Sequence, residues 1–212
     1  KLTPSPMKLT DHDYKEIEKM ADVQIRLSQL KHRERNQLLD EMNHFQFIIP
    51  ALIQEYEDQL SKAQQKALSD ILLLIWLYFG DNKIIRSTPV SFSMYEEKSN
   101  EHLRFLEKLG KLKPDSEEYN RLLIEDLEKV HSKALYAAVT MPFEMKGPLR
   151  RLDTQTRGAL MGELIALIAC FAEIADNRPR LTLSRTREDA PVQPWQEEMD
   201  LFIDDIEENL EP

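Results

Sequence analysis

The sequence predicts an all-α fold, and three observations lead to that expectation. Glycine accounts for only 5 of 212 residues, so few positions are free to adopt the positive φ angles that tight hairpins need. Apolar residues recur at steps of three and four along most of the chain, which is the period of an amphipathic helix. Apart from a short alternation at 181–183, no segment alternates apolar and polar residues as a half-buried strand does. We therefore expect a bundle of about six helices.

Two amphipathic helices are expected first in the chain, at 11–31 and 35–60. The first is capped by Thr10 or Asp11, and acidic residues in its first turn face the positive end of the helix dipole. Its apolar face is diluted by polar side chains, which favours a place at the edge of the core. The second helix contains Pro50, and the missing backbone donor there predicts a kink.

The third expected helix covers 62–79 and should lie at the centre of the bundle. Its second half, Ile71–Phe79, is apolar on every side, and a helix without a polar face is surrounded by other elements. At this length it is too short to span a bilayer. Gly80 is expected to end the helix in the left-handed conformation, and a loop is expected over 81–91.

The remaining helices of the bundle are expected at 92–112, 116–140 and 152–176, separated by proline-containing breaks. The bundle domain then covers 8–177. The segment 178–194 holds three prolines and four arginines and is predicted to form a linker or extended arm. The last helix is expected within 195–212.

Charge and cysteine content limit the class of protein. The net charge of −10 speaks against a partner such as nucleic acid or an anionic membrane, which requires a basic surface. The single cysteine, Cys170, excludes an intramolecular disulfide and favours a cytoplasmic protein. No glycine-rich phosphate loop, Gly-x-Ser-x-Gly elbow, His-Glu-x-x-His or paired Cys-x-x-Cys motif occurs. We therefore expect a non-enzymatic protein without a cofactor.

The C-terminal segment carries the strongest local signal for binding. Its apolar residues recur at helical spacing and are Trp195, Met199, Phe202, Ile206 and Leu210. Eight acidic residues and no basic one lie between and after them, so most of the net charge of the chain is here. An apolar stripe with an acidic back is typical of a helix that docks into a groove. The groove belongs to its own domain, to a second copy or to another protein.

Two Glu-x-x-His pairs suggest a metal centre as an alternative. Glutamate and histidine at i and i+3 share a helix face, and di-metal carboxylate bundles combine two such pairs with glutamates from two further helices. The candidate ligands are Glu18, Glu41, His44, Glu97, Glu101, Glu128 and His131. Periodicity places both pairs at the edge of their apolar stripes or outside them, whereas bundle-core ligands must point inward. An oxidase or metal store is therefore the weaker interpretation.

Three further features stand out. His102 lies in the middle of the apolar face of 92–112, where it is either a buried histidine bonded to a neighbour such as Ser99 or a functional group. Arg150 and Arg151 follow a Gly-Pro turn and form a basic cluster that suits an acidic partner. Small residues at every fourth position, from Gly158 to Cys170, predict close packing with another helix. They are Gly158, Gly162, Ala166 and Cys170.

The sequence as a whole favours a helical protein-interaction module, such as an adaptor, regulator or inhibitor. Its partner is another protein or a second copy of the chain, through the C-terminal stripe and, secondarily, through Arg150 and Arg151. A di-metal carboxylate bundle is one alternative. A helical sensor of a small ligand is another, because bundle interiors are able to hold such molecules.

Overall fold

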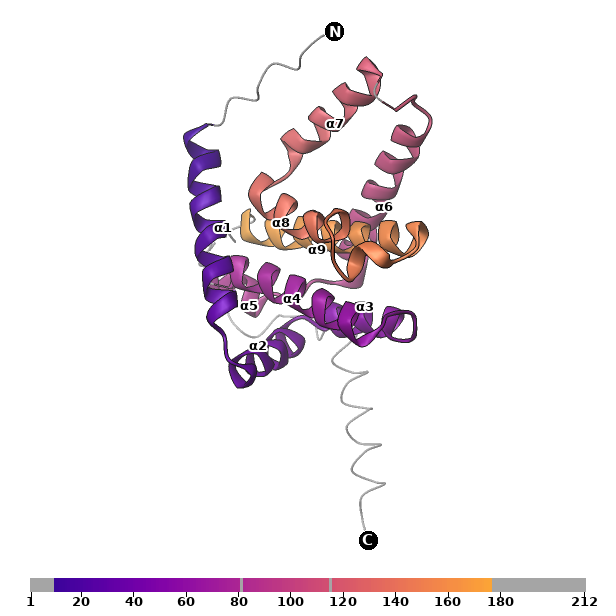
Figure 1. Cartoon of the computed structure of the whole chain (residues 1–212). Coiled ribbons are helices and arrows are strands. Elements are labelled where there is room, and N and C mark those ends of the chain that lie inside the picture. Colours follow the sequence, from indigo (N-terminus) through magenta and orange to yellow (C-terminus); the bar gives the residue numbers. More distant parts are fainter. Residues whose placement is uncertain (1–9, 81, 115, 177–212) are drawn as a thin grey trace, which may run out of the picture. The chain divides into compact units, whose positions relative to one another are not determined.

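A computed structural model of the chain describes residues 10–80, 82–114 and 116–176, which belong to one compact unit. Within these ranges the structure consists of α-helices and two short 3₁₀ turns, without a strand, which confirms the predicted all-α class. The α-helices are α1 (Asp11–Gln29), α2 (His32–Phe45), α3 (Ile48–Tyr56), α4 (Lys62–Phe79), α5 (Lys83–Ser87), α6 (Phe92–Gly110), α7 (Glu117–Lys129), α8 (Lys133–Glu144) and α9 (Thr154–Asp176) (Figure 1). The 3₁₀ turns are η1 (Glu57–Gln59) and η2 (Leu149–Arg151).

The core is built around α4, as its all-round apolarity predicts. Every side chain from Ile71 to Phe79 is buried, and α4 packs against α1, α2, α8 and α9. Each buried aliphatic or aromatic side chain contributes roughly 1.5–3 kcal/mol to folding. The core cluster runs from Met20 to Ile174, so the described residues enclose a hydrophobic core of their own.

Helix α1 lies against α4 and α8, and its start is fixed by a capping box. The hydroxyl of Thr10 accepts a hydrogen bond from the backbone N–H of Asp13, whose carboxylate accepts one from the N–H of Thr10 in return. Only Met20 and Val23 are buried on this helix, in agreement with its predicted place at the edge of the core. A hydrogen bond from the Tyr78 hydroxyl to the Glu16 carboxylate ties α1 to α4.

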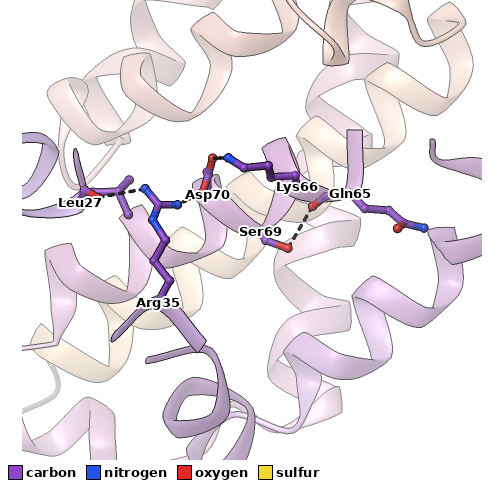
Figure 2. A network of polar contacts seen from close by, with 6 residues as sticks. All are labelled: Leu27, Arg35, Gln65, Lys66, Ser69 and Asp70. Carbon is purple, nitrogen blue, oxygen red and sulfur yellow. Dashed lines mark hydrogen bonds and ion pairs between the residues drawn. The ribbon is translucent and has the colours of Figure 1, made fainter. Parts of the chain in front are cut away.

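The end of α1 is held to α2 and α4 by one arginine (Figure 2). The guanidinium of Arg35 donates to the carbonyl oxygen of Leu27 at 2.9 Å and pairs with the carboxylate of Asp70. Lys66 Nζ lies 3.0 Å from the same carboxylate. The Arg35 and Asp70 side chains are 25% and 32% exposed, so water screens part of their attraction.

The predicted helix over 35–60 is wrong in one respect, because it is two helices. α2 ends at Phe45, and α3 starts at Ile48. The reason is Gln46, whose fully buried side-chain amide donates to the Ile85 carbonyl oxygen at 2.7 Å and accepts from the Val90 N–H at 2.9 Å. These bonds satisfy backbone groups of a distant loop and require the chain to turn here.

Pro50 therefore does not kink a long helix. It lies in the first turn of α3, where a backbone N–H has no partner within the helix and its absence costs little. The predicted loop over 81–91 is also partly wrong, because 83–87 forms the short helix α5. Gly80 has φ −66° and ψ −15°, so it ends α4 in the right-handed region and not in the predicted left-handed one.

The predicted helix over 116–140 is wrong in the same way. α7 ends at Lys129 and α8 begins at Lys133. Ser132, which is buried, accepts a hydrogen bond from the N–H of Leu135 and so starts a new helix with its own cap. The chain turns between the two helices, and α7 extends with α6 as a hairpin away from the layer that contains α8 and α9 (Figure 1).

Candidate functional site

A cleft of about 670 Å³ lies where the α6–α7 hairpin meets α8 and α9. Its floor is apolar and comes from α9, and its walls carry one large side chain from each of the other three helices. The floor residues are Ile165, Ala166, Ile168, Ala169 and Ala172, and the wall residues are Phe105, Leu122 and Tyr136. The alanine side chains of the floor are short and fill little of the cleft, so the cleft has room for a further element.

The hairpin leaves part of its apolar surface exposed. Neither α6 nor α7 has a buried side chain, although α7 carries an apolar stripe typical of a helix packed on one side. Ile124 is 48% exposed and Leu103 on α6 is 52% exposed, although neither lines the cleft. Leu122, which lines it, is half-buried. A strongly amphipathic helix without a buried residue is unusual in a folded domain, where packing of the apolar face supplies most of a helix's stability. This exposed apolar surface is typical of interaction sites.

Charged side chains surround the apolar floor. The bases on the rim are Lys98, Arg104, Lys108 and Lys129, and the acids are Glu101, Asp126 and Asp176. Lys98 is engaged by Glu173 at 2.9 Å and by Glu101 at 3.4 Å. The hydrogen bond to Glu173 is the main reason why the pKa of Lys98 is raised.

His102 lies at the contact between α6 and α9. A methyl group added at Gly162 would lie 3.2 Å from His102 Cδ2, so the absence of a side chain at Gly162 is what lets the imidazole approach α9. The prediction that the small residues of 152–176 admit another helix closely therefore holds at Gly162, and α6 and α9 are the most extensive helix pair. No hydrogen bond joins His102 to Ser99 in the described ranges, and the imidazole is half-buried in the cleft wall.

Three titratable groups from three helices, His102, Asp126 and Tyr136, line the cleft. Burial lowers the pKa of His102, and the charge of Asp126 opposes this. Burial raises the pKa of Asp126, against the influence of His102 and Lys129. The Tyr136 pKa is raised, mainly by burial and further by Asp126. Burial therefore favours the neutral form of each of these three groups.

The predicted metal ligands do not come together. Among the described residues, which include all seven candidates, no group of three His, Cys, Asp or Glu side chains is arranged to hold an ion. Glu41 pairs with Arg86 at 3.0 Å. The exposed candidates are Glu18, His44, Glu97, Glu101, Glu128 and His131.

His131 lies outside a helix, between α7 and α8. Its Nδ1 atom is 3.6 Å from the carboxylate of Asp176, and its ring is 5.9 Å from that of Phe79. Because His131 follows the end of α7, it does not share a helical face with Glu128, and the i, i+3 geometry that motivated the pair is lost.

Arg150 and Arg151 are exposed in the η2 turn. Arg151 and Lys146 line a shallow second cleft of about 350 Å³ beside the start of α4. The N-terminus of α4 is already satisfied by a capping box between Ser61 and Gln64. This turn is a basic surface, and its geometry indicates no particular ligand.

The predicted C-terminal binding stripe lies outside the described residues. It comprises Trp195, Met199, Phe202, Ile206 and Leu210. The predicted arm at 178–194 lies outside them as well.

Sequence reasoning missed the cleft because it joined α7 to α8. A straight helix over 116–140 would lie along the bundle, whereas the turn at Ser132 directs α7 away from it. The signal present in the sequence was Ser132, because serine is able to cap a helix. The apolar stripe of 116–140 continues on both sides of this residue, so the break was not predicted.

Helix α9 is the one helix in the described ranges that is long and apolar enough to cross a membrane. Half of its apolar window is buried inside the protein. Core helices meet the same criteria of length and composition, so this is weak evidence for a membrane segment. Comparison of the chain with protein-family models, with curated proteins and with solved structures finds no match.

Proposed function

We propose that the protein is a helical protein-interaction module whose cleft at α6, α7 and α9 receives an amphipathic helix of a partner protein. The observation that carries this proposal is the amphipathic helix α7, which has no buried side chain and borders an open cleft with an apolar floor. Helix-in-groove recognition uses such a surface, with anchors on the ligand at i, i+3, i+4 and i+7.

The charges favour an acidic ligand helix. Lys98 is neutralised by its own carboxylate partners, but no ion pair in the described ranges engages the three other rim bases, which are Arg104, Lys108 and Lys129. A partner with acidic residues beside its apolar stripe would place them near these bases. Arg150 and Arg151 remain a second proposed contact for an acidic partner.

A display library of helix-length peptides tests this function. It is panned against the full chain, against Ala169→Glu, which places a charge on the cleft floor, and against Ala159→Glu, which places the same charge on an exposed part of α9. We expect peptides that bind the wild type and Ala159→Glu but not Ala169→Glu, and that combine a helical apolar stripe with acidic residues. Peptides that bind all three forms equally would overturn the proposal.

A small-ligand sensor is a second candidate, favoured by the size and chemistry of the same cleft. Its volume of about 670 Å³ lies within the roughly 300–1,000 Å³ of small-molecule sites, and His102, Asp126 and Tyr136 offer polar groups beside apolar walls. Native mass spectrometry of the purified full chain tests this candidate. A stoichiometric adduct that is lost in Ala169→Glu supports it, and the absence of any adduct speaks for the protein ligand.

A further inference from the structure

We propose that the occupant of the cleft is the chain's own segment 195–210, supplied by the same copy. This inference rests on the proposed function, since it names the helix that the cleft receives. A partner protein would then have to displace this segment, so that the module regulates its own binding.

Charge complementarity is the first argument. The last 18 residues carry eight acidic side chains and no basic one, whereas Arg104, Lys108 and Lys129 stand on the cleft rim. The rim as a whole is mixed, because Glu101, Asp126 and Asp176 line the cleft as well. The complementarity is therefore between the acidic segment and the three bases that no ion pair in the described ranges engages. Complementary charges fix the register of a docked helix and exclude partners of the wrong sign.

Shape is the second argument. As a helix, 195–210 would be about 24 Å long at 1.5 Å per residue, and its apolar side chains would lie on one face. That face presents one large ring early, at Trp195, and Phe202 at its middle. A floor made of small alanine side chains, such as Ala169 and Ala172, is suited to receive bulky anchors of this kind.

Chain connectivity is the third argument. Asp176, the last residue of α9, itself lines the cleft, so the connection to the segment begins at the edge of the site. The 18 residues of 177–194 give a reach of about 25 Å for a coil of that length. A tether of this size produces an effective concentration on the order of millimolar, so even a weak helix–groove interaction would be populated.

Tryptophan fluorescence of the full chain is the first test. The chain has two tryptophans, of which Trp76 is 1% exposed, so the spectrum of the wild type minus that of Trp195→Phe isolates Trp195. We expect Trp195 emission to be blue-shifted relative to a synthetic peptide of residues 194–212. Ala169→Glu should return it to the peptide value, and Ala159→Glu should leave it unchanged. Circular dichroism and the emission of Trp76 report whether each variant is folded.

Crosslinking identifies where the segment 195–210 docks and which copy of the chain supplies it. Cys170 is buried and its pKa is raised to about 12 by burial, so engineered cysteines react with a short bismaleimide before it does. Ala169→Cys combined with Ile206→Cys should crosslink far faster than Ala159→Cys combined with Ile206→Cys. We expect a product with the mass of one chain, whereas a product of two chains would overturn docking within one copy.

Charge reversal on the rim provides a variant that leaves the apolar floor intact. Lys108→Glu combined with Lys129→Glu should slow the diagnostic crosslink by about two- to fivefold per charge, whereas Lys111→Glu, which lies outside the cleft, should have no effect. Equal crosslinking of the two cysteine pairs, or Trp195 emission like that of the free peptide, would overturn the inference. If library peptides still depend on Ala169 in that case, the proposed function stands and only the identity of the occupant is wrong.

Discussion

The close approach of α6 to α9 at Gly162 leads to a prediction in which two glycines of one helix respond differently to the same substitution. Gly158 and Gly162 both lie inside α9. An added methyl group meets nothing within 4 Å at Gly158 but lies 3.2 Å from His102 Cδ2 at Gly162. Gly158→Ala is therefore a matched control, since both changes have the same effect on the unfolded chain and on helix propensity.

The expected magnitudes follow from these two distances. Alanine is better than glycine inside a helix by about 1 kcal/mol, so Gly158→Ala should stabilise the fold by that amount and raise Tm by about 2–4 °C. At Gly162 the same gain is opposed, because His102 must move by a few tenths of an ångström from its packed position. A displaced side chain of this kind costs about 0.5–1.5 kcal/mol, so the net effect of Gly162→Ala should be close to zero.

A double-mutant cycle measures the opposing contribution directly. Urea denaturation of the full chain gives the free energy of unfolding for Gly162→Ala, for His102→Ala and for both together. In the His102→Ala background, Gly162→Ala should regain the full stabilisation, with a coupling energy of about 0.5–1.5 kcal/mol. Equal stabilisation by Gly158→Ala and Gly162→Ala in both backgrounds would refute the close contact of His102 with α9.

Three further predictions concern the contacts that hold the helices in place. Gln46→Leu leaves the Val90 N–H buried without a partner and should cost about 2–3 kcal/mol in urea denaturation, against almost nothing for the exposed Gln54→Leu. The N–H of Thr10 lowers the pKa of Asp13 to about 2, so its stabilisation exists above pH 4 and is lost as the pH falls towards 2. The Tm gap between wild type and Asp13→Asn should close over that range, and a constant gap would contradict the capping box. Arg35→Met should cost about 1 kcal/mol, less in high salt, and a matched Arg33→Met should be neutral.

The parts of the fold that the sequence predicts well are those specified by local patterns. The bounds of 62–79 agree with α4 because a polar first turn and nine consecutive apolar residues lie within the helix itself. The cap at Thr10 is likewise local, since it involves residues three apart. Local signals of this kind require no knowledge of what the helix packs against.

The parts that sequence reasoning missed depend on distant contacts. The break between α2 and α3 is stabilised by bonds from Gln46 to backbone groups about 40 residues later, at Ile85 and Val90. A glutamine within a regular helical stripe gives no hint of such partners. The candidate metal ligands were misplaced for a related reason, because the i, i+3 spacing of Glu128 and His131 has meaning only if the helix continues through both, and α7 ends at Lys129.

The cleft results from two features of the sequence acting together. One is the series of small residues along α9, and the other is Ser132, which starts a new helix. Small residues along α9 were predicted to admit another helix closely, and at Gly162 the imidazole of His102 fills that space. Farther along the same helix Ala169 and Ala172 are equally small, but there they line the open cleft, since α7 turns away at Ser132. The same small side chains that allow close packing in one place therefore leave an unfilled apolar floor in another. A ligand helix with bulky anchors would supply the packing that the hairpin lacks, and for this reason the proposed binding function is placed at this floor as a hypothesis that the peptide library tests.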